Sequence, residues 1–162
     1  MYLPFQQMPE TARIWIYQAD RELSATEIKY VKERLVAFCE QWNTHGTSMP
    51  TSFDIQHNRM IILAVDEAQL GASGCSIDSS VRVLREIEQQ LSISLLDQGK
   101  VSFINEGQII TSKLQELKKH IDAGNLREET AVFNSLVNKK QDLSDRWLIP
   151  AKDSWLRKYF IH

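Results

Sequence analysis

The sequence predicts an α+β protein: a ferredoxin-like βαββαβ antiparallel sheet with two helices on one face, plus a C-terminal α/β appendage. The 162-residue chain is 43% hydrophobic and 25% charged, which is ordinary for a soluble globular protein. Strand-like and amphipathic segments follow in the order strand, helix, strand, strand, helix, strand up to residue 104. We therefore expect a core over 1–104 and an appendage over 105–162, packed on the core as one unit.

The first strand and helix have clear local signals. Arg13–Gln18 is rich in β-branched and aromatic residues, which predicts a strand. Ser24 and Glu27 have the spacing of a capping box, and apolar residues then recur at steps of three and four. Those residues are Ile28, Val31, Leu35, Phe38 and Trp42. We expect this helix to end near His45-Gly46, since glycine accepts the left-handed conformation.

A hairpin and a second helix complete the predicted core. Alternation over Thr51–Gln56 and the apolar run Met60–Val65 predict two strands, joined by a tight turn at residues 57–59. An amphipathic helix follows from Ile77 to Leu91, and Lys100–Ile104 supplies the fourth strand. We interpret Trp15 and Tyr17 as core and sheet packing; the alternative is an exposed patch opposite the helices, used for a ligand or a homodimer.

The last third predicts shorter elements. They are a turn at Asn105-Glu106-Gly107, a return strand over 108–110, a helix from Ser112 to Ala123-Gly124, a strand-like stretch over 130–137, a short helix over 139–147 and an aromatic C-terminal segment over 152–160. We expect the aromatic residues of the final segment to dock it onto the rest of the protein.

Charge and composition argue against several classes of protein. A net charge of −2 argues against nucleic-acid binding, which usually needs a basic face. No apolar run reaches the roughly 18 residues of a membrane span, and the N-terminal residues do not resemble a signal peptide. Cys39 and Cys75 stand in different contexts, as expected for two free thiols of a cytoplasmic protein. We expect no cofactor and no metal, because the cysteines and histidines match no zinc spacing.

The stretch Gly71–Ser80 is the candidate site, at the junction of a buried strand and a helix. The simplest interpretation is a tight connection in which the glycines relieve strain and Ser76 caps the helix. The alternative is a ligand site in which backbone N–H groups at the helix start hold an anion such as phosphate. Its candidate residues are Gly71, Ser73, Gly74, Ser76, Asp78 and Ser79. Asp78 counts against an anion, because its carboxylate already occupies the positive end of the helix.

Cys75 is the candidate catalytic residue of the same stretch. A helix start lowers a thiol pKa, but a nucleophile also needs a base or a cation nearby. His45 and His57 are the candidates, and His57 is expected about 20 Å away, a strand length. A divalent cation held by Asp66, Glu67 and Asp78 is less favoured than a solvated carboxylate cluster.

The whole chain resembles a family of short uncharacterised bacterial proteins. The shared segments are residues 2–5, 9–13, 15–21, Trp42 with His45-Gly46, 71–80, 132–134 and 152–155. Members are sometimes labelled ABC transporter ATPases, yet this chain has no Gly-x-x-x-x-Gly-Lys-Ser/Thr loop, so ATPase activity is not supported. The C-terminal third is similar to GYF-like modules, which implies peptide or partner binding, although their peptide-binding aromatic motif is absent here.

No complete catalytic set emerges from these residues. We therefore expect a non-catalytic cytosolic binding or interaction protein whose ligand or partner site includes Gly71–Ser80. The alternative is a small enzyme that uses Cys75, or an anion site for a phosphate or acyl group, at the same helix start.

Overall fold

Two larger antiparallel sheets organise the protein, in agreement with the predicted α+β class. The structure is a computed structural model that describes residues 1–44, 47–67 and 74–161. The chain divides into two units, one of Met1–Gln98 with Asn138–Gln141 and one of Gly99–Val137 with Asp142–His162. The first unit therefore ends its main segment at Gln98, before the strand that we expected to complete it.

The sheet of the first unit contains β1 (Arg13–Gln18), β4 (Thr51–Gln56) and β5 (Met60–Val65) in the order β1-β5-β4. Both neighbouring pairs are antiparallel, and every residue of β5 is buried, as its unbroken apolar run indicates. The predicted turn between β4 and β5 is present. His57 and Asn58 adopt φ of 54° and 57° there, a conformation that asparagine tolerates well.

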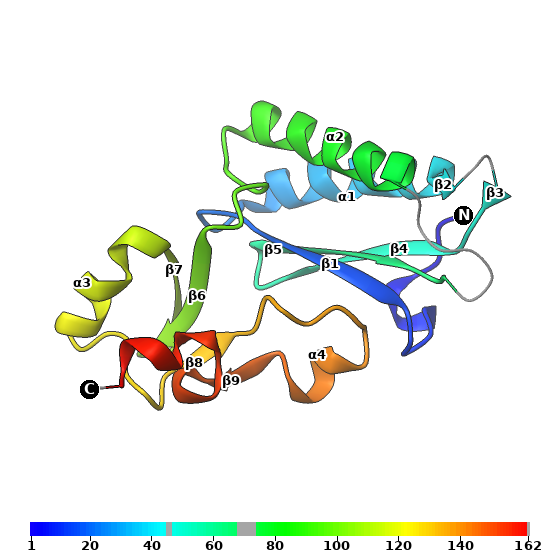
Figure 1. Ribbon diagram of the computed structural model, residues 1–162. Coiled ribbons are helices and arrows are strands. Elements are labelled where there is room, and N and C mark those ends of the chain that lie inside the picture. Colours follow the sequence, from blue (N-terminus) through cyan, green and yellow to red (C-terminus); the bar gives the residue numbers. More distant parts are fainter. Residues whose placement is uncertain (45–46, 68–73, 162) are drawn as a thin grey trace. The chain divides into compact units, whose positions relative to one another are not determined.

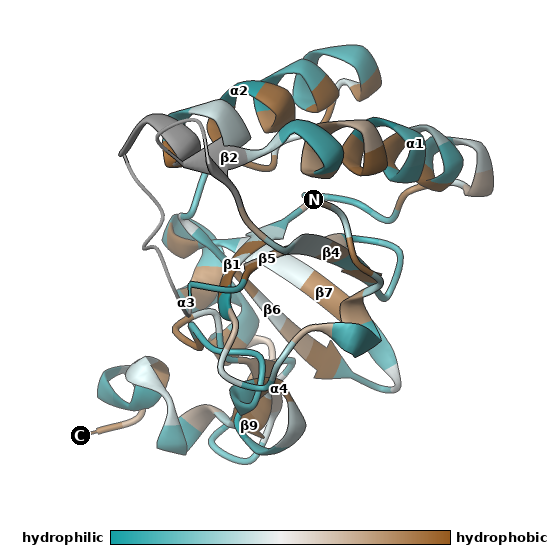
Figure 2. Cartoon of the chain, turned by 90° about the vertical axis from the view of Figure 1, so that its right-hand side faces the viewer, coloured by the Kyte–Doolittle hydropathy of each residue, from teal (hydrophilic) through white to brown (hydrophobic). Residues whose placement is uncertain are grey.

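Two helices, α1 (Ala25–Gln41) and α2 (Gly74–Leu91), lie side by side over one face of this sheet (Figure 1). The predicted capping box of α1 is formed by Ser24 and Glu27. Hydrophobic and hydrophilic residues alternate along both helices (Figure 2). Buried residues on the sheet-facing sides join Leu35 and Leu84 to Tyr17 and Leu63, so helix packing buries one face of the sheet.

The fourth strand of the predicted core is absent from this sheet. Lys100–Asn105 forms β6 and pairs with β7 and β8 of the second sheet instead. The edge of β1 is occupied by residues 138–141: the Ile14 N–H donates to the Asn138 carbonyl, and the Lys140 N–H to the Ala12 carbonyl, both at 2.9 Å. A two-residue turn brings β7 to β6, and so short a loop favours that local pairing.

The second sheet has the order β7-β6-β8-β9. Its strands are β6, β7 (Gln108–Lys113), β8 (Ala131–Phe133) and β9 (Leu148–Pro150), and its helices are α3 (Leu117–Asp122) and α4 (Asp142–Asp145). Short 3-10 turns cover 114–116, 151–153 and 155–159. Phe103, Leu117 and Leu156 are among the residues of its core.

Several predicted boundaries are wrong. The strand-like stretch 130–137 contains only β8. The helix expected over 139–147 shortens to α4, because Asn138 and Lys140 hydrogen-bond instead to Ile14 and Ala12 at the start of β1. The first helix ends at Gln41, since Trp42 turns extended with ψ of 124°. A short ladder of β2 (Asn43–Thr44) and β3 (Thr47–Ser48) follows, while His45 and Gly46 lie outside the described residues.

Candidate functional site

The predicted site residues that the structure describes lie at the start of α2. Gly71 and Ser73 lie outside the described residues, as does His45. Gly74, Cys75 and Ser76 open α2, with side chains outside what the structure describes. Ser76 is therefore the third residue of the helix and not its N-cap, because the helix begins three residues before its first apolar position.

Asp78 also lies differently from the sequence-based expectation. It is the fifth residue of α2, exposed, and the first turn of the helix contains no acidic residue. Asp78 therefore does not neutralise the helix start, and it no longer counts against anion binding there. Ser79, the next residue of the helix, is half-buried and lines a groove formed by α1 and α2.

This groove, which we call the α1–α2 groove, has a volume of about 240 Å³ and is lined from both helices. Its lining residues are Arg34, Phe38, Gln41 and Trp42 from the end of α1, and Ser79, Arg82, Val83 and Glu86 from α2. On each helix the residues follow steps of three and four, which place them on one helix face. Ser79 links the groove to the predicted segment Gly71–Ser80.

The floor of the groove is apolar and aromatic. The Phe38 and Trp42 rings have centroids 5.0 Å apart, and Trp42 and Val83 are buried. Trp15 meets Trp42 from β1 with ring centroids 6.0 Å apart. Trp15 and Tyr17 therefore face the helices, and the alternative of an exposed patch on the opposite sheet face is wrong.

The rim of the groove is charged. Arg34 of α1 forms an ion pair with Glu86 of α2 across the groove. Arg82 is exposed, and no hydrogen bond or ion pair of its guanidinium occurs within the described part of the chain. The rim thus carries two cations and one anion, with one cation available to a ligand.

A tyrosine ties α2 to the sheet beside this groove. Tyr17 of β1 is buried and hydrogen-bonds Ser80, whose hydroxyl donates to the Ile77 carbonyl at 2.6 Å. Burial raises the pKa of the Tyr17 phenol. This contact fixes the turn of α2 that contributes Ser79.

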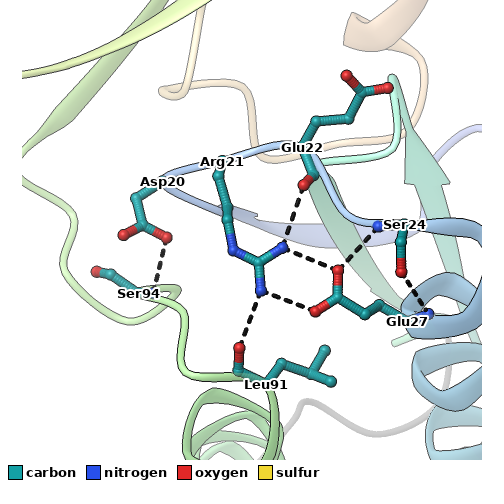
Figure 3. A network of polar contacts seen from close by, with 7 residues as sticks. All are labelled: Asp20, Arg21, Glu22, Ser24, Glu27, Leu91 and Ser94. Atoms are coloured by element: carbon teal, nitrogen blue, oxygen red, sulfur yellow. Dashed lines mark hydrogen bonds and ion pairs between the residues drawn. The ribbon is translucent and has the colours of Figure 1, made fainter.

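The opposite end of the helix pair is held by Arg21 (Figure 3). Its guanidinium donates to both carboxylate oxygens of Glu27, at 2.8 and 2.7 Å, and to the Leu91 carbonyl at the end of α2. The Asp20 carboxylate accepts from the Ser94 N–H at 3.0 Å. These bonds join the start of α1 to the end of α2, so both ends of the groove-forming pair are anchored.

Other candidate residues are engaged elsewhere. Burial raises the pKa of the Cys39 thiol to about 12, so this cysteine is a core residue. Glu67 pairs with Arg13 at 3.2 Å, and His57 stands in the β4–β5 turn. Among the described residues, no group of three potential ligands could hold a metal ion, and no helix is long and apolar enough to cross a membrane.

No family model, curated protein or solved structure matches the chain. The sequence does not mark Arg34, Phe38 or Arg82 as site residues, and it predicts core packing for Trp42. The sequence shows the helical spacing of these residues, but it does not show which faces of the two helices meet, so it does not predict the groove.

Proposed function

We propose that this is a binding protein whose ligand or partner occupies the α1–α2 groove, beside the predicted segment Gly71–Ser80. The groove itself carries this proposal: a concave site of about 240 Å³ with an aromatic floor and a charged rim. Small-molecule and side-chain recognition typically combines an apolar floor with a few convergent polar groups.

The residue types of the groove and the anchoring of its two helices support the same proposal. Aromatic and arginine side chains recur at binding hot spots, and this rim offers Arg82 without a described partner. Helix pairs anchored at both ends, here by Tyr17 and Arg21, present such side chains on a rigid frame.

We also propose that the first unit is a variant of the ferredoxin-like arrangement. The strand order β1-β5-β4 with two helices on one face supports it, and residues 138–141 lie on the β1 edge where the fourth strand would pair. This proposal concerns the fold and carries no activity with it.

Chemical-shift mapping tests the binding proposal. The whole chain is titrated with small organic acids, amines, neutral compounds and short peptides, and the amide shifts are mapped onto the structure. We expect saturable shifts to cluster on α1 and α2 around the groove, whichever chemical class binds.

A blocking variant and a matched control make the test specific. Ser79→Trp places an indole in the groove, whereas Gln89→Trp adds the same group at an exposed position of α2 away from the groove. Both variants should retain their circular dichroism. Binding that survives Ser79→Trp, or that maps to another surface, would contradict the proposal.

A further inference from the structure

We propose that the α1–α2 groove recognises a small oxyanion bearing an apolar group, and that Glu86 competes with this ligand for Arg34. The inference rests on the proposed function and specifies the chemistry of the ligand. Carboxylates and phosphates both present negatively charged oxygens, which are the groups that this site would bind.

Two guanidinium groups define the charge of the ligand. Arg34 reaches the groove from α1 and Arg82 reaches it from α2, so the two cations border the same 240 Å³. A guanidinium offers a planar fork of N–H donors that matches the two oxygens of a carboxylate or phosphate. Ser79 and Gln41 add polar groups at the same rim.

The floor and the volume of the groove indicate that the ligand also has a small apolar group. Phe38, Trp42 and Val83 provide an apolar surface below the cations, which favours an organic anion over a bare ion. The volume lies below the roughly 300–1,000 Å³ of sites that enclose drug-sized ligands. The groove therefore suits one small group, such as an aromatic acid or a phenyl phosphate.

Glu86 places a carboxylate of the chain itself on one of the two cations. Its carboxylate lies on Arg34 across the groove, and its side chain is 49% exposed while that of Arg34 is 35% exposed. An ion pair this exposed is only weakly stabilising, so an incoming oxyanion can replace it. Glu86 then lowers the affinity for every oxyanion, because each must displace it.

The experiment measures affinity for three probes of similar shape: benzoate, phenyl phosphate and neutral benzyl alcohol. Each is titrated into the whole chain and into four variants, with amide shifts at the groove as the readout. Arg82→Gln is matched by Arg85→Gln, an exposed arginine of α2 outside the groove, and Glu86→Gln by Glu33→Gln, an exposed glutamate of α1.

We expect at least one oxyanion to bind more tightly than benzyl alcohol, and the tighter of the two identifies a carboxylate or a phosphate ligand. Arg82→Gln should weaken its binding about tenfold. Glu86→Gln should strengthen it about three- to tenfold, and both control variants should leave it within twofold.

The failures are distinguishable. If Arg82→Gln weakens binding but Glu86→Gln leaves it unchanged, the competition by Glu86 is overturned and the oxyanion site stands. If benzyl alcohol binds as tightly as the two anions, the oxyanion specificity is overturned while the groove remains a binding site. If none of the probes shifts the groove resonances, the ligand class is overturned, and the fragment mapping decides the proposed function separately.

Discussion

At the scale of single residues, Arg21 and Glu27 show how one ion pair serves two elements. Glu27 caps the α1 start through the Ser24 N–H and holds Arg21, which in turn donates to the end of α2 (Figure 3). The hydrogen bond from Arg21, and then the one from the Ser24 backbone, lower the pKa of Glu27 from 4.5 to about 2.

The lowered pKa predicts a pH-dependent stability. A carboxyl whose pKa falls on folding stabilises the native state above its unfolded pKa of 4.5, and this contribution disappears as the pH drops toward 2. We expect Glu27→Gln to lower the melting temperature at pH 7, with a gap to the wild type that closes between pH 4.5 and 2. Glu33→Gln is the control; a gap independent of pH would contradict the assignment.

Cys39 gives a second prediction at this scale. Burial raises the pKa of its thiol to about 12, and reactive thiols need an accessible thiolate. The native chain should therefore consume at most one equivalent of iodoacetamide at pH 8, and two after unfolding in guanidinium. Rapid modification of both cysteines in the native state would show that the core around Cys39 opens.

At the scale of elements, the turn between β6 and β7 stores strain. Glu106 and Gly107 have φ of 52° and 77°, and Asn105 pairs with Gln108, so the loop is a two-residue turn of type I′. Glycine accepts this conformation, but an L-residue such as glutamate is strained there.

Glu106→Asn should relieve that strain, since asparagine adopts positive φ more readily. We expect a gain of about 1 kcal/mol in the free energy of unfolding, measured by denaturant titration. Glu106→Gln, which removes the same charge without favouring positive φ, is the control and should leave the stability unchanged. An unchanged or lower stability of Glu106→Asn would mean that the glutamate side chain makes a compensating contact.

Elements with a local signal could be predicted from the sequence. The Ser24–Glu27 capping box, the apolar run of β5 and the turn at His57-Asn58 each depend on neighbouring residues, and the structure confirms them. The pairing partner of β6 and the residues that meet across the α1–α2 groove depend on distant contacts. Arg34 and Arg82 are 48 positions apart in the sequence. Helical periodicity predicts that each lies on the polar face of its own helix, but it does not predict that the two border one groove.

At the scale of the whole molecule, the chain passes between its two units three times, at residues 98–99, 137–138 and 141–142. The four residues 138–141 therefore belong to a unit whose other residues end at Gln98. Lys140 anchors them: its ammonium donates to the Met8 carbonyl at 2.7 Å and lies 5.3 Å from the Phe5 ring centroid.

Lys140→Met should therefore weaken the first unit although it lies 42 positions beyond Gln98. The side chain is only 11% exposed, and loss of its charged hydrogen bond should cost about 1–3 kcal/mol. Hydrogen exchange at the Ile14 amide, which donates to Asn138, reports the loss directly. The neighbouring exposed Lys139→Met should leave that exchange rate unchanged; equal effects of the two variants would contradict the anchoring role.

The most direct test of the binding account is a phenyl phosphate titration of the whole chain, of Arg82→Gln and of Arg85→Gln. The resonances to follow are the indole N–H of Trp42 and the amides of Arg34 and Val83, which line the groove. We predict saturable shifts at these positions, with affinity about tenfold weaker in Arg82→Gln and unchanged in Arg85→Gln. Equal affinities in the two variants, or shifts that map away from the groove, would contradict the account.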